Sequence, residues 1–330
     1  MKAYKFLGAG AALLLACSCT SENKALTDTT AAVTEIAEIT ELAETKPQET
    51  IASASRLLSC NFFDDSSFIM WDNKAKDYPS DKAILAGVVP HHLTAGQLIS
   101  GFFRAASKSR EEVETVVIIA TSHYEGRNTL YTTFSDWASP FGTVETDSVV
   151  AKAFCDKLGA VTDDERLEAD HAAASHIPFV KHYFPEAKTA CLLVAPSYDM
   201  KTPQRIAEAL DSLPEKEKYL FLFSIDFSHY LTPEKADNRD MITRKAVEDK
   251  DYMRIEGFKN DNVDSPFCLS AYLRLSELLG GEVTEADNSN TMKIIGTPYS
   301  KEVYTEGVTS YFVYMTSQAA DKPPSASSAA

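Results

Sequence analysis

Residues 219–230 read YLFLFSIDFSHY, an apolar run that ends in polar side chains, among them Asp226 and His229. Two other apolar runs also stop at histidine: residues 82–89 (KAILAGVV), followed by Pro90, His91 and His92, and residues 115–121 (TVVIIAT), followed by Ser122 and His123. Short apolar runs separated by helical patterns are typical of buried parallel strands. The sequence therefore predicts an α/β fold with a mainly parallel central sheet and helices on both faces.

His91, His123 and His229 each follow the end of a predicted strand. In a parallel sheet the carboxyl ends of the strands share one edge, and ligands bind where the loops of that edge converge. Imidazoles from three separate strands can meet in one pocket, which suits a metal ion or a proton-transfer site. A single loop histidine is usually structural, but three of the seven histidines of the chain occupy equivalent places. This recurrence favours a functional site.

The rest of the folded part alternates helices and strands. A further buried strand is predicted at residues 189–195 (TACLLVA), and residues 307–315 (GVTSYFVYM) form a last strand whose alternation allows an antiparallel orientation. The predicted helices are residues 95–107, 147–158 with Asp147 as N-cap, 203–213, 233–248 and 267–279.

Cys268 lies in the first turn of the last predicted helix, after Ser265 as N-cap and Pro266. A helix N-terminus favours a thiolate, which would be a strong soft metal ligand or a nucleophile. A small residue that packs the start of a core helix explains the same pattern equally well. From the residues alone, both interpretations stay open.

The N-terminus has the pattern of an export signal. Lys2 and Lys5 precede an apolar stretch, residues 6–16, that ends in Leu-Leu-Ala before Cys17. The stretch is shorter than the ~20 apolar residues that span a bilayer, which disfavours an uncleaved membrane anchor. The pattern predicts a bacterial lipoprotein with a signal peptide at residues 1–17, lipid-modified at Cys17 and anchored in the cell envelope. An ordinary signal peptide is the alternative.

Composition divides the remaining chain into three parts. Residues 18–54 are rich in Ala, Thr and Glu without an aromatic residue, which predicts a disordered tether, and residues 319–330 form a predicted disordered tail. Residues 55–318 are long enough for one α/β domain. The net charge of −16 argues against nucleic acid as a partner. The cysteine spacing does not require a disulfide framework.

Several motifs together resemble the Memo-like family, known in bacteria as AmmeMemoRadiSam system protein B and in animals as a mediator of cell motility. The resemblance covers about residues 82–315, and SIDFSHY is its most specific piece. The matching positions are Pro90-His91, Ser122-His123, Ser139-Pro140-Phe141-Gly142 with Asp147, Asp170-His171 before Pro178-Phe179, residues 224–230, Asp240 and Cys268.

This resemblance implies the fold of the catalytic subunit of class III extradiol dioxygenases. It also implies a single metal ion held by His91, His123 and Cys268, with iron or copper favoured over zinc. His229, Asp226 and His171 are the implied catalytic residues of the same pocket. The chain departs from the family's pattern at His92-Leu93, Asp170-His171-Ala172 and Cys268-Leu269. A cysteine in place of the dioxygenase carboxylate would change the chemistry of the metal, so the fold does not transfer the ring-cleavage reaction.

Three functions follow as hypotheses. The leading one is a lipid-anchored metalloprotein that acts as a non-heme metal oxidoreductase, with His229 as proton donor or acceptor. The second is a zinc-dependent hydrolase that uses the same ligands. The third is a non-catalytic module that binds a small molecule or a peptide. The family resemblance further implies radical SAM and AMMECR-type proteins as functional partners.

Overall fold

The three apolar runs that end in histidine form adjacent strands of one sheet. A computed structural model of the chain describes residues 56–124, 126–197 and 199–319. Strands β2 (Ile84–Val89), β9 (Tyr219–Ser224) and β3 (Thr115–Thr121) lie side by side and are parallel, and β8 (Lys188–Val194) continues the parallel set beside β3. Because all four strands point the same way, the loops that carry the histidines lie at one edge of the sheet.

Outer strands extend this parallel centre on both sides. In the described residues the sheet has eight strands, in the order β10-β11-β2-β9-β3-β8-β4-β7. The predicted last strand is β11 (Ser310–Gln318), antiparallel to β2, and β10 (Gly281–Asn290) pairs antiparallel to it at the edge. The sequence analysis did not predict β10, because an edge strand that is mostly polar (GEVTEADNSN) has no apolar pattern.

Short strands complete the sheets. β4 (Leu130–Thr132) is antiparallel to β8, and β7 (Val161–Thr162) is parallel to β4. The strands of a separate three-stranded sheet are β1 (Leu58–Ser59), β5 (Trp137–Ser139) and β6 (Gly142–Val144).

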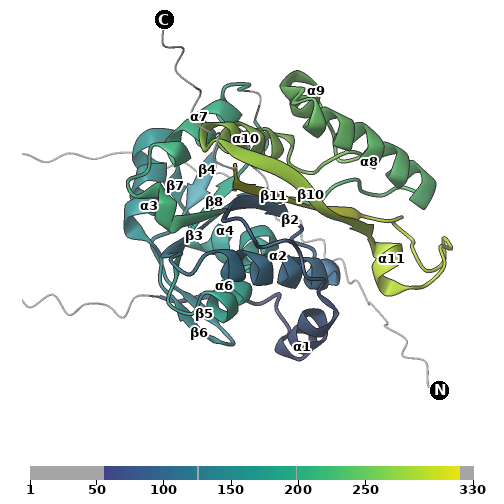
Figure 1. Cartoon of the computed structure of the whole chain (residues 1–330), viewed down its shortest axis with the longest axis horizontal. Helices are drawn as coiled ribbons and strands as arrows, with labels where there is room; N and C mark the ends of the chain where they lie inside the picture. Colours follow the sequence, from purple (N-terminus) through teal and green to yellow (C-terminus); the bar gives the residue numbers. More distant parts are fainter. Residues whose placement is uncertain (1–55, 125, 198, 320–330) are drawn as a thin grey trace, which may run out of the picture. The chain divides into compact units, whose positions relative to one another are not determined.

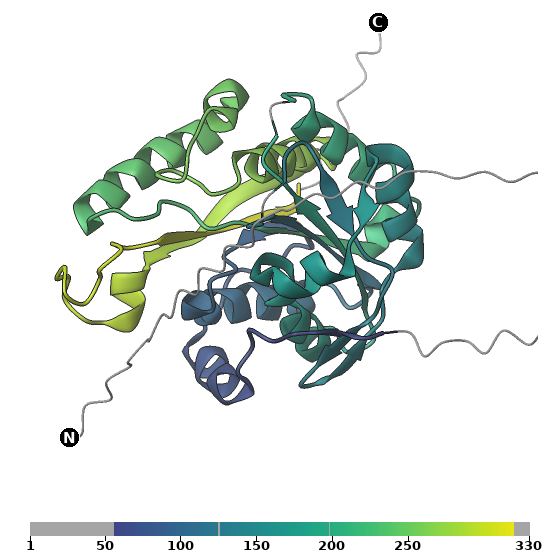
Figure 2. The same ribbon diagram turned by 180° about the vertical axis from the view of Figure 1, so that it is seen from behind.

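Helices cover both faces of the main sheet, as Figure 1 and the view from behind in Figure 2 show. The α-helices are α1 (Asp65–Lys74), α2 (Gly96–Ser109), α3 (Ser148–Ala153), α4 (Asp164–Ala169), α5 (His171–Ala174), α6 (Ile177–Tyr183), α7 (Thr202–Asp211), α8 (Pro233–Glu248), α9 (Tyr252–Glu256), α10 (Pro266–Leu278) and α11 (Thr291–Ile295). Alternate residues of β3 face opposite ways. Val116 and Ile118 pack in one core with α2 and α6, whereas Val117 and Ile119 pack in another with α7 and α10. The predicted fold class is confirmed.

The helix starts follow local sequence signals. The carboxylate of Asp147 accepts hydrogen bonds from the backbone N–H groups of Val149 and Val150, so Asp147 is the N-cap of α3 as predicted. A π-helical turn, Phe154–Leu158, continues α3 and ends at Gly159, whose φ of 73° is a left-handed conformation that glycine adopts without strain. At α10 the Ser265 side chain makes no capping hydrogen bond, although Pro266 begins the helix as predicted.

The predicted export signal at residues 1–17, with Cys17, and the tether at residues 18–54 lie outside the described residues, as does all but the first residue of the predicted tail. Across the described part of the chain, none of the helices combines the length and the apolar character that crossing a bilayer requires.

Candidate metal centre

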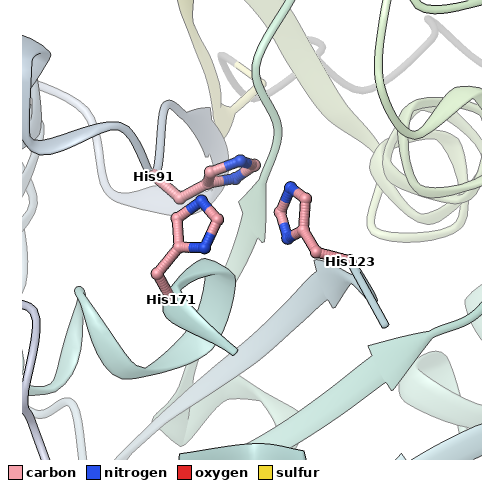
Figure 3. Close-up of side chains that lie close together, drawn as sticks. All are labelled: His91, His123 and His171. Atoms are coloured by element: carbon pink, nitrogen blue, oxygen red, sulfur yellow. The ribbon is translucent and has the colours of Figure 1, made fainter. Parts of the chain in front are cut away.

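Three histidines from three different loops converge at the carboxyl edge of the sheet. His91 follows β2, His123 follows β3, and His171 is the first residue of α5. Each offers one ring nitrogen, and these three atoms all lie within 4.8 Å of one another. The rings turn toward a common point in Figure 3. We call His91, His123 and His171 the histidine cluster.

Ser224, the last residue of β9, orients the His91 ring. Its hydroxyl donates to the backbone carbonyl of Ala172 at 2.6 Å, and it lies 3.1 Å from Nδ1 of His91. Because the Ser224 hydroxyl proton is already donated to Ala172, its oxygen accepts a hydrogen bond from the N–H at Nδ1 of His91. This tautomer leaves Nε2 of His91 with a free lone pair, as a metal ligand requires.

Asp170 orients the His123 ring in the same way. Its carboxylate lies 2.9 Å from His123 Nδ1 and accepts the backbone N–H of His123 at 2.7 Å. It also accepts the N–H of Ala172 and so caps α5. Burial alone would raise the pKa of Asp170, but the hydrogen bonds from His123 and Ala172 lower it below its usual range. A carboxylate on Nδ1 fixes the tautomer and raises the basicity of Nε2.

His171 is the third member of the histidine cluster. Its ring stacks on that of His123 with centroids 4.3 Å apart, and its centroid is 5.1 Å from that of His91. Burial, then the neighbouring His123, lowers the pKa of His171 to about 4. Burial and the neighbouring imidazoles also lower the pKa of His91 well below its usual value. Both rings are therefore neutral at pH 7 and have lone pairs to share with a metal.

Two buried carboxyl groups flank the His91 ring. Nε2 of His91 lies 3.6 Å from Oδ2 of Asp226 and 3.3 Å from Oδ2 of Asp264. Burial raises the pKa of Asp226 to about 7, and burial together with Asp226 raises the pKa of Asp264. A bound cation would stabilise both charged carboxylates beside the neutral imidazoles. The donor atoms present therefore fit a divalent transition metal.

Asp264 was missed from the sequence. It precedes Ser265 and Pro266, the residues that mark the start of α10. The available signal was an acidic residue next to a helix start, four residues before Cys268.

Cys268 is not a member of the histidine cluster. Its side chain is fully buried in the core between the sheet, α7 and α10. Burial raises the pKa of its thiol to about 12, which opposes the thiolate that a helix N-terminus would favour. Its assignment as a metal ligand stays a prediction.

His229 lies near the histidine cluster without joining it. Its charge would lower the pKa of His91, and its own pKa is lowered to about 4, mainly by burial. Its backbone N–H donates to the carbonyl of Asn260, while its Nδ1 is a buried atom with no hydrogen-bond partner among the described residues. Nδ1 of His92, the extra imidazole of the loop, lies 2.9 Å from the Tyr311 hydroxyl.

A cavity of about 670 Å³ adjoins the site through Asp264. Phe258, Phe267 and Met200 give part of its wall an apolar character, and Lys259 and Asn260 add polar groups. Thr121 and Val194, the last residues of β3 and β8, also line the cavity, which places it at the carboxyl edge of the sheet. The cluster histidines are not among its lining residues. Such an arrangement of an apolar cavity with a few polar groups is typical of ligand sites.

Comparison with known families agrees with the motifs. A sequence profile described as "Memo-like protein" matches residues 66–310. The chain belongs to the Memo-like family. The resemblance inferred from the motifs is thereby confirmed.

The curated relatives are distant in sequence. The chain is 27% identical over 211 residues to a MEMO1 family protein of Methanococcoides burtonii, a match that covers 61% of this chain and 77% of the relative. It is 26% identical over 232 residues to a MEMO1 family protein of Thermoplasma acidophilum, with 67% and 83% covered. Among solved structures, an uncharacterized protein from Escherichia coli K12 aligns with a TM-score of 0.47 at 11% identity, over 70% of this chain and 98% of that one.

Proposed function

We propose that this protein is a metal-dependent oxidoreductase, with one metal ion held by His91, His123 and His171 beside a cavity for a small-molecule substrate. The observation that carries the proposal is the convergence of three imidazole nitrogens within 4.8 Å of one another. Ser224 is hydrogen-bonded to Nδ1 of His91, and Asp170 is hydrogen-bonded to Nδ1 of His123. The Nε2 atoms of both rings are thereby oriented for a metal ion. Such support is a hallmark of metal-binding histidines.

Iron is the metal we favour. Imidazole nitrogens with a nearby carboxylate and open coordination positions are the donors of non-heme iron(II) oxygenases. A buried thiol whose pKa is about 12 is a weaker reason for copper than the sequence suggested. Bound iron(II) would supply a site for dioxygen next to the substrate.

The surrounding residues supply the proton chemistry. His229 is neutral at pH 7, because its pKa is about 4, and its Nδ1, which has no hydrogen-bond partner among the described residues, is the atom we assign to proton transfer. Asp226, with a pKa of about 7, can donate or accept a proton near neutrality.

Metal analysis after anaerobic purification tests the proposal. We expect about one metal ion per chain in the wild type and strongly reduced metal in His91→Ala, His123→Ala and His171→Ala. His182→Ala is the matched control, because His182 packs against Phe68, away from the histidine cluster. Equal metal content in all five proteins contradicts the metal site.

A zinc-dependent hydrolase is the second candidate. Three histidines with an open fourth position are also the ligands of catalytic zinc sites, where the metal lowers the pKa of its bound water. Zinc in the purified protein, together with ester or phosphoester turnover that needs no oxygen, would favour this function. Iron together with substrate-dependent oxygen uptake would favour the oxidoreductase.

We also propose that the protein is a lipoprotein of the cell envelope, modified at Cys17, because the residues before Cys17 have the pattern of a lipoprotein signal. Cys17→Ala should leave the precursor unprocessed or release the protein from the membrane fraction. Normal cleavage with unchanged membrane association in this variant would contradict the anchor.

A further inference from the structure

The Asp264 carboxyl group is buried beside His91, and one of its two oxygens lacks a hydrogen-bond partner among the described residues. The side chain is only 9% exposed, and Oδ2 accepts the backbone N–H of Asp226 at 3.3 Å. Oδ1 is a buried atom with no hydrogen-bond partner among the described residues. Burying a carboxylate oxygen without a partner is costly, so such an atom calls for an explanation.

The other carboxylate oxygen of Asp264, Oδ2, lies close to the His91 ring. Metal–nitrogen and metal–oxygen bonds of about 2.0–2.2 Å, at angles between 90° and the tetrahedral angle, place two ligand atoms roughly 2.8–3.6 Å apart. Nε2 of His91 and Oδ2 of Asp264 are 3.3 Å apart. This pair is at the separation of two ligands on one ion. Asp264 does not belong to the group of ligand atoms that lie within 4.8 Å of one another, so its carboxylate would have to move toward His123 and His171 when the ion binds.

Neighbouring acids and thiols fit this role less well. Oδ1 of Asp226 accepts the backbone N–H of His91 at 3.1 Å, so this carboxylate holds the loop after β2. Cys268, one helical turn after Asp264, is packed in the apolar core. Asp264 also lines the cavity, which places it between the histidine cluster and the space for a substrate.

We propose that Asp264 is the fourth protein ligand of the metal, in the place that the sequence analysis gave to Cys268; this inference rests on the metal site proposed above. The backbone of the loop before α10 is fixed near the histidine cluster, because the backbone N–H of Asp264 donates to the carbonyl of Asp226 at 3.1 Å. Three imidazole nitrogens and one carboxylate oxygen form a harder donor set than two imidazoles and a thiolate. This set selects iron(II) or zinc(II) over copper(I).

Metal affinity in matched variants tests the inference. Dissociation constants for iron(II) and zinc(II) would be measured anaerobically by chelator competition in the wild type, Asp264→Asn, Asp226→Asn and Cys268→Ser. Loss of a direct ligand should weaken binding by more than about 100-fold in Asp264→Asn, above the 10–100-fold typical of residues that only orient ligands. Asp226→Asn should fall inside that range, and Cys268→Ser should bind like the wild type.

A second measurement begins with the wild type. The visible and near-ultraviolet spectrum of the cobalt(II)-loaded wild type reports the ligands directly, because a cobalt–thiolate bond produces an intense near-ultraviolet charge-transfer band. We expect this band to be absent. A band that disappears in Cys268→Ser would overturn the inference and restore Cys268 as the ligand.

The histidine variants separate the two proposals. If His91→Ala and His171→Ala lose the metal while Asp264→Asn binds it within about tenfold of the wild type, the role of Asp264 is refuted and the metal site stands. If the histidine variants keep full affinity, the metal site itself is refuted, and the role of Asp264 with it.

Discussion

Asp240 and Asp264 are both buried aspartates, and their surroundings differ in one respect. Oδ1 of Asp240 accepts the hydroxyls of Ser228 and Ser310, at 3.2 and 2.6 Å, and Oδ2 accepts the side-chain amide of Asn288 at 3.3 Å. Asp264 has one donor on Oδ2 and none on Oδ1 among the described residues. We call Asp240, Ser228, Ser310 and Asn288 the Asp240 network.

The difference is the one expected between a structural aspartate and an aspartate in the binding role proposed for Asp264. Burial raises the pKa of both carboxyl groups, so burial by itself does not mark a functional site. The Asp240 network saturates its acceptors with side chains of the protein and ties β11 to the loop after β9. The region around Asp264 combines an unsaturated oxygen with neutral imidazoles, which is the condition for binding a cation.

The largest expected effect is loss of metal when two cluster histidines are removed. His91→Ala/His123→Ala should bind no measurable metal, because the remaining donors cannot hold an ion against competition from water. Asp240→Asn, the counterpart from the Asp240 network, should keep wild-type metal content. Metal analysis of the three purified proteins, with circular dichroism as a check of folding, measures this. Retention of metal in the double variant would contradict the assignment of metal binding to the histidine cluster rather than to the Asp240 network.

The next largest effect is a loss of stability when the Asp240 network is disrupted. Asp240→Ala leaves two hydroxyls and an amide buried without their acceptor, and should lower the free energy of unfolding by about 2–4 kcal/mol. Asp264→Ala removes no comparable set of donors, and should cost the metal-free protein less. Urea unfolding of both variants after removal of metal with a chelator gives the comparison. A larger loss in Asp264→Ala would mean that Asp264 is the structural residue.

The free energy of unfolding should depend on pH through the buried His176, by about 2 kcal/mol between pH 7 and pH 5. His176 is fully buried, lies 3.0 Å from Ser224 through Nε2, and has its pKa lowered to about 3, mainly by burial. The folded state keeps this ring neutral while the unfolded chain protonates it below about pH 6.5, so its contribution to stability is lost as the pH falls from 7 to 5.

His176→Gln should therefore reduce the loss of unfolding free energy between pH 7 and pH 5. Urea unfolding of the metal-free wild type and variant at several pH values measures it. The exposed His182 offers the control His182→Gln, which should follow the wild type. Identical slopes in wild type and His176→Gln would contradict a neutral buried His176.

The smallest effect sharpens the role of Ser224. Ser224→Ala removes the acceptor of His91 Nδ1 and should weaken metal binding by about tenfold, the lower end of the range for residues that orient ligands. Ser228→Ala makes the same chemical change four residues later, in the Asp240 network, and should leave metal affinity unchanged while lowering stability. Competition assays on the two variants decide whether orientation of His91 by Ser224 matters.

Local patterns determined much of this fold. The three apolar runs predicted β2, β3 and β9, because a strand buried on both faces needs an almost continuous apolar sequence. Their common direction follows from the helical segments between them, and it brings His91 and His123 to one edge. The polar edge strand β10 left no such pattern, so it escaped prediction.

The third histidine of the cluster depended on tertiary structure, although the family resemblance implied His171 in the same pocket as a catalytic residue. His171 follows no strand, and only the packing of the short helix α5 against β3 and β8 brings its ring to that of His123. At the start of α10, helical spacing predicted a buried face but could not say which side chain of the first turn and its flank points toward the sheet edge. The packing of α10 places Cys268 in the core and Asp264 beside His91. Spacing along the chain records the period of each element, whereas the meeting of side chains from separate elements is set by how those elements pack.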